Sequence, residues 1–349
     1  MTQQTDFVNE FNARWDAGLD TFTLTTSGTT GSPKPWILHR SYLEWSANST
    51  RSAWLQGLPL HQYCFLPTWK TAGFMQLVRS KVWQQPIEVF EPKTNPLLEV
   101  VPQGGITSLT PMQLSVILQD DFSLENLNRF DAVLIGGQAL PKDLQFQLIQ
   151  HCPNPKFIET FGSTETASHF AGRVVSFGNQ GTNSFENSPE RIGTLLTISA
   201  SEEFFTATPG TEIKVNPFTG QLEVKNPTTQ NQWLSTNDLV ELVGTSSFRW
   251  IGRKDLIINT GGIKVQIEPL ESQISLLTGW PIGSFYVVAK PDPVLGEKIV
   301  LHTLHNVDLG QLEFLFASLP PYHQPKEMYT VNRIPLTETG KIQRKTPVL

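Results

Sequence analysis

The first half of the chain alternates short apolar runs with longer stretches in which apolar residues recur at helical spacing. Short runs bounded by Gly or Pro are typical of buried β-strands, whereas helical spacing is typical of helices that bury one face. Strands that alternate with helices favour βαβ units and a mostly parallel sheet. The pattern predicts strands at 21–26, 63–66, 131–135 and 156–160, and helices at 40–55, 73–81, 111–118 and 142–150.

The texture changes after about residue 173, where Gly, Pro, Asn and Thr become dense. Two short β-like runs, 212–215 and 222–224, flank a turn and predict a hairpin in a small β subdomain. After residue 255 the pattern predicts a helix near 269–277, a strand at 284–289 and a helix near 309–319. We therefore expect an α/β fold: a large N-terminal α/β domain (1–254) with a mostly parallel sheet and the β subdomain, and a small α+β C-terminal domain (255–349) on a hinge.

Composition and charge narrow the class of protein. The 349 residues carry 26 basic and 32 acidic side chains, a net charge of −6, without the basic stripe that nucleic-acid binders show. No apolar run approaches the roughly 18 residues of a membrane span, and the polar first ten residues lack a secretion signal. The two cysteines are far apart and fit a reducing compartment. These features predict a cytoplasmic enzyme or binding module without a nucleic-acid or membrane partner.

The segment Thr26–Lys34 is rich in glycine and small hydroxylated residues. Such a loop leaves backbone N–H groups free to surround an anion, and Lys34 adds a positive charge. It lacks the GxxxxGK[ST] spacing of a Walker loop, and an ordinary flexible turn is the alternative. We predict that it binds phosphate, through Thr26, Ser27, Gly28, Thr29, Thr30, Gly31 and Lys34.

Three further segments carry possible chemistry. Glu165 follows a predicted strand among hydroxyl groups, where a carboxylate can hold Mg²⁺ against a phosphate, although a helix cap is the alternative. Asp238 and Arg253 can bind ribose or phosphate, although a turn aspartate and a surface arginine explain them equally well. Lys341 lies on a Gly-containing C-terminal segment that can deliver it to a phosphate, although solvent is the usual place for a terminal lysine.

In this order the motifs resemble the adenylate-forming superfamily of acyl-CoA synthetases, luciferase-like enzymes and peptide-synthetase adenylation domains. Residues 26–34 match TSGTTGxPK, and 161–165 match YGxTE with Phe for Tyr. Residues 252–262 match GRxDxIIxxGG, and 335–344 match PxTxxGKIxR. The similarity runs from about residue 23 to residue 344.

The resemblance implies that a carboxylate attacks the α-phosphorus of ATP to give an acyl-adenylate, and that coenzyme A then displaces AMP. It implies that 27–34 hold the β,γ-phosphates and that Lys341 stabilises the adenylation transition state. It further implies α-phosphate contact by Thr164, Mg²⁺ binding by Glu165 and ribose binding by Asp238 with Arg253 nearby. Gly136, Gly137, Gln138, Glu159, Thr160 and Phe161 would frame the adenine, with Gly162 also among the ATP-binding residues. Asp255 would be the hinge about which the small domain rotates, bringing the loop of Gly261, Gly262 and Lys264 to the thiol channel.

The sequence departs from the superfamily in three places. Only 25 residues precede the phosphate loop, so we expect a shortened N-terminal region. Asn237 replaces the Gly before the ribose aspartate, a substitution that αL geometry tolerates. Lys70 stands where acyl-CoA synthetases often carry a His.

Within the superfamily the chain looks most like the compact o-succinylbenzoate–CoA ligases of menaquinone and phylloquinone synthesis. Their substrate carries a second carboxylate, which needs a cation or several donors. Lys70, His39 and Arg79 are open candidates, and Trp69 and Phe74 either contact the aromatic ring or pack in the core. Lys70, Gly73 and Ser163 are the predicted acid-binding residues.

Three alternatives stay open: a ligase for another small aromatic acid, a non-catalytic nucleotide-binding relative, and an adenylation module that loads a separate carrier protein. The presence of Lys341, Glu165, Asp238 and Arg253 together disfavours the non-catalytic alternative.

Overall fold

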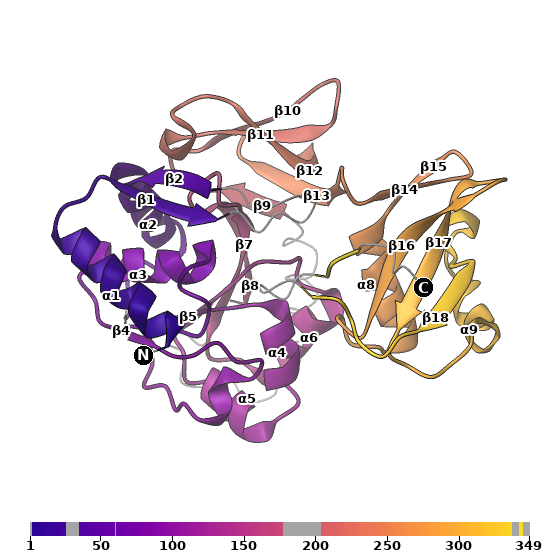
Figure 1. The fold of residues 1–349 in the computed structure, drawn as a ribbon, viewed down its shortest axis with the longest axis horizontal. Coiled ribbons are helices and arrows are strands. Elements are labelled where there is room, and N and C mark those ends of the chain that lie inside the picture. Colours follow the sequence, from indigo (N-terminus) through magenta and orange to yellow (C-terminus); the bar gives the residue numbers. More distant parts are fainter. Residues whose placement is uncertain (1, 26–34, 60, 177–203, 337–341, 345–349) are drawn as a thin grey trace, which may run out of the picture.

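The structure is a computed structural model and describes residues 2–25, 35–59, 61–176, 204–336 and 342–344. The described strands form three sheets of two, eleven and five strands. The eleven-stranded sheet and its helices make up the larger part of the molecule, and the five-stranded sheet lies beside it (Figure 1).

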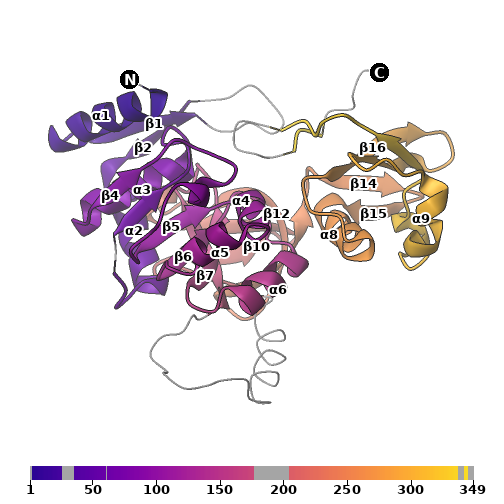
Figure 2. The ribbon, with the colours of Figure 1, turned by 90° about the horizontal axis from the view of Figure 1, so that it is seen from below.

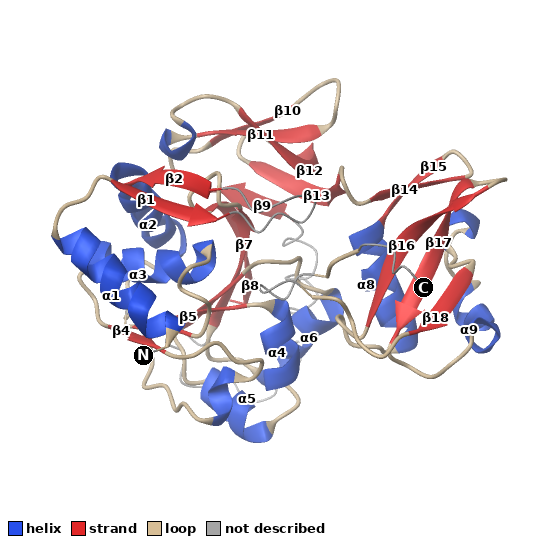
Figure 3. Ribbon diagram, in the orientation of Figure 1, coloured by secondary structure: helices blue, strands red, loops and turns tan. Residues whose placement is uncertain are grey.

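One half of the large sheet is parallel and lies between two layers of helices (Figure 3). Its strands run in the order β4–β3–β5–β6–β7. Side chains alternate across each strand, so Ala132 and Leu134 pack in one apolar cluster and Val133 and Ile135 in another. The bounds are β3 Gln62–Cys64, β4 Ile87–Val89, β5 Ile106–Leu109, β6 Ala132–Ile135 and β7 Lys156–Gly162.

The helices on the two faces of the sheet belong to two different apolar clusters. The first cluster holds apolar residues of α1 (Gln3–Asp16), α2 (Arg40–Trp54) and α3 (Thr71–Trp83). The second holds apolar residues of α4 (Pro111–Ile117), α5 (Asp121–Leu127) and α6 (Lys142–His151). Burial on both faces explains why these strands are short continuous apolar runs in the sequence.

The other half of the large sheet is antiparallel. From β7 it continues in the order β8–β9–β13–β12–β11–β10, and every added pair is antiparallel. The α/β fold class expected from the sequence is confirmed, with one refinement: the hairpin region is hydrogen-bonded into the same sheet. The bounds are β8 His169–Ser176, β9 Phe204–Ala207, β10 Glu212–Val215, β11 Gln221–Lys225, β12 Leu234–Leu242 and β13 Ser247–Arg253.

A separate two-stranded sheet precedes α2. Its strands β1 (Thr21–Thr25) and β2 (Pro35–His39) pair antiparallel from Thr21 with His39 to Thr25 with Pro35. The predicted phosphate loop, 26–34, joins them and lies outside the described residues.

The five-stranded sheet follows β13, and the helices described here, α8 and α9, pack on the same face of it. Its order is β15–β14–β17–β16, with β18 parallel to β17. The helices pack on one face, whereas Ile334 and Ile342 pack on the other; Figure 2 shows that segment on the side away from α8. The bounds are β14 Ile257–Thr260, β15 Ile263–Gln266, α8 Ile267–Thr278, β16 Phe285–Asp292, β17 Gly296–Thr303, α9 Leu309–Phe316 and β18 Glu327–Thr330.

Among the helices described, none combines the length and the apolar character needed to cross a lipid bilayer.

Candidate active site

Most of the predicted site residues in the first part of the chain follow parallel strands at one edge of the large sheet. Lys70 and Gly73 follow β3, Gly136–Gln138 follow β6, and Ser163–Glu165 follow β7. The carboxyl ends of parallel strands meet at the same edge, which is where open α/β sheets bind ligands. The alternation of strands and helices in the sequence therefore brings these three segments together.

A direct contact joins the loop after β3 to the loop after β7. The hydroxyls of Thr71, the first residue of α3, and Thr164 lie 2.7 Å apart. The loop around Thr164 has its own internal ties, because the Thr166 hydroxyl accepts from the Ser163 N–H at 3.1 Å and lies 2.7 Å from the Ser168 carbonyl. Thr164, the predicted α-phosphate contact, is thus held from two sides, and Thr71 is a residue that the sequence analysis missed.

Glu165 is the predicted magnesium ligand. Its carboxylate is partly exposed and makes no hydrogen bond or ion pair with the described residues. The described residues contain no cluster of three or more potential metal ligands, so the protein offers here one carboxylate and neighbouring hydroxyls. Such a donor set fits Mg²⁺, which commonly binds through one or two carboxylates together with substrate phosphates.

The residues predicted near the adenine are anchored in the sheet. The Thr160 hydroxyl donates to the Ile135 carbonyl at 2.9 Å, at the start of the Gly136–Gln138 loop. The Phe161 ring lies 5.1 Å from that of Phe205 and 5.2 Å from that of Phe248, so it packs in the aromatic core of the antiparallel half. Gly162 leaves no room for a side chain, because a Cβ there would lie 2.2 Å from the Ser168 carbonyl oxygen.

Glu159, immediately before these residues, takes part in a buried ion pair that the sequence analysis missed. Its Oε2 lies 2.6 Å from both Nε and Nη2 of Arg173, and its Oε1 accepts from the Leu140 N–H at 2.9 Å. Glu159 is 3% exposed. Because one carboxylate binds both β8 and the loop after β6, the pair fixes the segment in which Gly136–Gln138 lie.

The three candidates for a second carboxylate differ in their surroundings. His39 ends β2, is exposed, and packs its ring edge on Tyr42 at 5.1 Å. Lys70 precedes α3 and already has an interaction partner. Gly73 allows α3 to approach the strand end closely, because a Cβ there would lie 2.4 Å from the Pro67 carbonyl oxygen. Phe74 is buried in the core against Phe11 and Phe22, which resolves its role as packing.

Arg79 is buried without a counter-charge among the described residues. Its side chain is 3% exposed, and its Nη2 lies 3.1 Å from the Ser168 hydroxyl and 3.4 Å from His169 Nε2. Burial, with the charge of Arg79, lowers the pKa of His169 well below its ordinary value, so the ring is neutral. Burial lowers the pKa of Arg79 to about 10, so the guanidinium stays charged near neutral pH. A desolvated cation of this kind favours an anionic ligand.

The predicted ribose residues lie on adjacent strands near the end of the large sheet. Asp238 of β12 pairs in register with Arg253 of β13, and its Oδ1 accepts from Trp250 Nε1 at 3.2 Å. Arg253 forms a two-point ion pair with Asp255, with both N–O distances at 2.8 Å. In this arrangement the predicted hinge residue and the predicted nucleotide arginine bind each other.

The predicted thiol-side loop lies between β14 and β15 in the five-stranded sheet. Gly261 and Gly262 both have positive φ, which suits glycine, and Lys264 is exposed on β15. Lys341 lies outside the described residues, as do Thr26–Lys34. On either side of 337–341, Leu336 and Ile342 form an antiparallel bridge.

A cluster of charged groups joins α8 to the C-terminal segment and to the end of β13. Arg344 donates to Glu271 Oε2 at 2.5 Å, and Glu271 Oε1 accepts from the Val287 N–H at 2.8 Å. Glu268, one turn earlier on α8, has a buried Oε2 without a hydrogen-bond partner. Burial raises the pKa of Glu268 to about 7; the charges of Arg344 and Arg253 oppose the shift, and those of Glu271 and Asp238 add to it.

Replacing Glu268 by Gln is expected to flatten the dependence of stability on pH. The folded-state pKa is raised from 4.5 to about 7, so the folded protein binds a proton in this window that the unfolded chain has lost. Stability contributed by that proton is present below pH 4.5 and is lost as pH rises through 7. This pKa shift corresponds to at most about 3 kcal/mol of stability. At pH 8 the free energy of unfolding of the variant should therefore exceed that of wild type by about 1–3 kcal/mol.

The measurement is urea unfolding at pH 5, 6, 7 and 8. The control is Glu313→Gln, at an exposed position on α9, which should follow the wild-type profile. Parallel pH profiles for Glu268→Gln and wild type would contradict the assignment.

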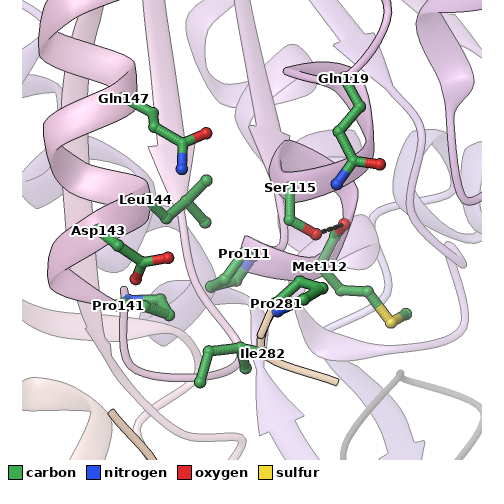
Figure 4. Close-up of a pocket in the computed structure, with 10 residues that line it drawn as sticks. All are labelled: Pro111, Met112, Ser115, Gln119, Pro141, Asp143, Leu144, Gln147, Pro281 and Ile282. Carbon is green, nitrogen blue, oxygen red and sulfur yellow. Dashed lines mark hydrogen bonds between the residues drawn. The ribbon is translucent and has the colours of Figure 1, made fainter. Parts of the chain in front are cut away.

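A small cleft separates α4 and α6 from the loop before β16 (Figure 4). Its volume is about 50 Å³, well below the roughly 300 Å³ at which small-molecule sites begin. Pro281 and Ile282 face the helices across it. The cleft therefore cannot hold a nucleotide or an aromatic acid.

Comparison with known proteins identifies the family. The model of the AMP-binding enzyme family matches residues 16–225, which is more than half of the chain. Tyrocidine synthase 3 of Brevibacillus parabrevis is 24% identical over 93% of this chain, which spans 5% of that much longer protein. A probable 2-succinylbenzoate–CoA ligase of Mycobacterium tuberculosis is 26% identical over 92% of this chain and 82% of its own length.

Solved structures agree with the fold. An acyl-CoA synthetase (AMP-forming)/AMP-acid ligase II-like protein from Dyadobacter fermentans is 29% identical, with a TM-score of 0.61 over 98% of this chain and 93% of that one. The o-succinylbenzoate CoA synthetase of Bacillus subtilis, in complex with its acyl-adenylate, is 20% identical, with a TM-score of 0.70 over 92% of this chain and 67% of that one. The family match and the fold define an adenylate-forming enzyme. The chain belongs to the AMP-binding enzyme family.

Proposed function

We propose that this protein is an ATP-dependent acid–CoA ligase that acts through an acyl-adenylate. The observation that carries the proposal is the position of Thr164 and Glu165. A hydroxyl held by Thr71 and a carboxylate without a partner among the described residues lie together at the carboxyl edge of the parallel strands. Such a pair suits a phosphate with Mg²⁺, because Mg²⁺ commonly binds one carboxylate together with substrate phosphates and open α/β sheets bind ligands at this edge.

The proposed reaction has two steps. A carboxylate oxygen of the acid bonds to the α-phosphorus of ATP, and the bond to the bridging oxygen breaks to release pyrophosphate. The sulfur of coenzyme A then bonds to the acyl carbon, AMP leaves with the electron pair of the broken C–O bond, and the thiol proton passes to solvent. A carboxylate is a poor electrophile, and the first step activates it by attaching AMP, which is a good leaving group.

The residues take the following proposed roles. Glu165 holds Mg²⁺, which neutralises phosphate charge when bound, and Thr164 contacts the α-phosphate. Asp238 binds the ribose hydroxyls. Arg253 contacts the nucleotide after exchanging its ion pair with Asp255 for that ligand. The proposed domain boundary follows residue 254, between β13 of the large sheet and β14 of the five-stranded sheet, and Asp255 is its hinge.

We propose o-succinylbenzoate as the acid, in keeping with the named activity of the Mycobacterium tuberculosis relative. This substrate has a second carboxylate, and Arg79 is the favoured cation. Arg79 is a buried charge without a counter-ion among the described residues, whereas His39 is exposed and Lys70 has a partner. A cytoplasmic location fits ATP and coenzyme A as cosubstrates and the two free, buried cysteines.

ATP–pyrophosphate exchange tests the proposal. Purified protein is assayed with o-succinylbenzoate, benzoate, a medium-chain fatty acid and no acid. Exchange with o-succinylbenzoate alone is the expected result. Exchange with benzoate alone would support adenylation but show that the acid is not o-succinylbenzoate. Loading of a carrier protein in place of coenzyme A would show that the acyl acceptor is a carrier protein. If no acid supported exchange while ATP still bound, the proposal would be overturned in favour of a non-catalytic nucleotide-binding protein.

A further inference from the structure

The N-terminal helix α1 carries a buried glutamine whose amide is fully hydrogen-bonded. Gln4 is 2% exposed. Its Nε2 donates to the carbonyls of Leu66 and Phe90 at 3.0 and 3.1 Å. Its Oε1 accepts from the N–H and the hydroxyl of Thr68, both at 3.1 Å. Four bonds from one neutral side chain fix a loop more specifically than an apolar contact does.

The fixed loop leads directly into the proposed site. Leu66 and Thr68 follow β3, and Thr68 is fully buried. Lys70 and Thr71 come next, and the Thr71 hydroxyl meets that of Thr164 at 2.7 Å. On its other side the loop contacts Gly73 so closely that no larger residue would fit there. The loop is therefore held between α1 and the first turn of α3.

The rest of α1 ties two further elements together. The Phe11 ring lies 5.7 Å from that of Phe22 on β1 and 5.4 Å from that of Phe74 on α3. Strand β1 ends at Thr25, directly before the predicted phosphate loop. Figures 1 and 2 show α1 along the outside of the large domain, beside β1 and α3.

We propose that α1 is a brace for the active site and that Gln4 is a positioning residue that acts through Thr68. It sets the loop 66–70, and with it Lys70, for binding of the acid. The assignment rests on the proposed ligase function, but its structural part does not. Gln4 touches no reacting atom, and Thr164 sits in a loop that has its own hydrogen bonds through Thr166. Removal of the Gln4 amide therefore shifts the acid subsite at Lys70 and leaves the nucleotide subsite in place.

The Gln4→Leu variant loses all four hydrogen bonds of the amide while keeping a side chain of similar volume. Gln3→Leu is the matched control, because Gln3 is the adjacent residue and is exposed. We expect Gln4→Leu to raise KM for the acid by roughly tenfold or more while KM for ATP stays within about twofold, since small displacements of a positioned group have large kinetic effects. Gln3→Leu should match wild type in both constants.

Substitutions of Thr68 test the same Gln4–Thr68 contact independently, from its other side. Thr68→Val removes the hydroxyl at constant shape and should reproduce part of the effect, whereas Thr68→Ser keeps the hydroxyl and should restore wild-type KM. The double variant Gln4→Leu/Thr68→Val should be no worse than Gln4→Leu alone, because the two residues act through one contact.

Hydrogen–deuterium exchange of the 66–74 amides completes the test and needs no turnover. Faster exchange there in Gln4→Leu than in Gln3→Leu supports the brace, and unchanged exchange overturns it. A lowered melting temperature with unchanged KM for the acid would reduce Gln4 to a stabilising residue and overturn the positioning role. If wild type turns over no acid, the proposed function fails, while the exchange result still decides the brace.

Discussion

Pyrophosphate exchange by Lys341→Ala is expected to fall about 10²- to 10³-fold below wild type, with ATP binding retained. The reason is electrostatic: a fixed cation that meets the charge developing on the phosphate in the transition state contributes on this scale. The residues flanking 337–341 are anchored, because Ile342 bridges Leu336 and Arg344 pairs with Glu271. The variant therefore removes a charge without loosening the described part of this segment.

A second assay makes the Lys341 prediction specific. Acyl-adenylate supplied directly should be converted to the thioester at near the wild-type rate, because the proposed domain rotation withdraws Lys341 in that step. Lys345→Ala, a lysine beyond the motif, is the charge-matched control and should leave both steps unchanged. An equal loss in both steps would indicate that Lys341 supports the fold or the nucleotide site generally.

The sequence pattern located most elements of the parallel half because each has a local cause. The helix expected at 40–55 is α2, Arg40–Trp54, and the one expected from Pro111 is α4, Pro111–Ile117. Proline in a first helical turn is a local signal, and here a capping box at Thr110 strengthens it. The helix expected from Gly73 instead begins two residues earlier, at Thr71, whose hydroxyl lies 2.7 Å from that of Thr164.

The missed parts of the site are contacts between residues far apart in the chain. Gln4 and Thr68 are 64 residues apart, and Thr71 and Thr164 are 93 residues apart. No periodicity records which strand end lies beside which, so neither contact has a signal in one sequence. Glu268 likewise has an ordinary position in the first turn of a helix, and its raised pKa comes from burial against other elements.

The sequence contained a partial indication that Arg79 binds a ligand. Arg79 directly follows the buried run 73–78 of α3, whereas the other charge of this helix, Lys81, is partly exposed and pairs with Asp16. A charge at such a position is either paired or meets a ligand. The structure removes the first alternative among the described residues, because Arg79 contacts only the neutral Ser168 and His169.

Arg79→Met is expected to raise KM for o-succinylbenzoate about 100-fold while leaving KM for ATP unchanged. Removal of one partner of a buried charge pair commonly changes binding by about 2–5 kcal/mol. The variant should not unfold, because it replaces a buried charge that has no counter-charge among the described residues with an apolar side chain of similar length. Initial-rate kinetics and thermal unfolding measure the two quantities side by side.

Two comparisons separate charge recognition from packing. Benzoate, which lacks the second carboxylate, should lose little or nothing in Arg79→Met if it supports exchange at all. Arg129→Met, at a surface arginine paired with Glu125, is the matched control and should behave as wild type. If Lys70→Met and not Arg79→Met raised KM for o-succinylbenzoate, the cation for the second carboxylate would be at the start of α3. Because Arg79 lies two turns deeper along the same helix, the two variants also show how far the acid extends beside α3.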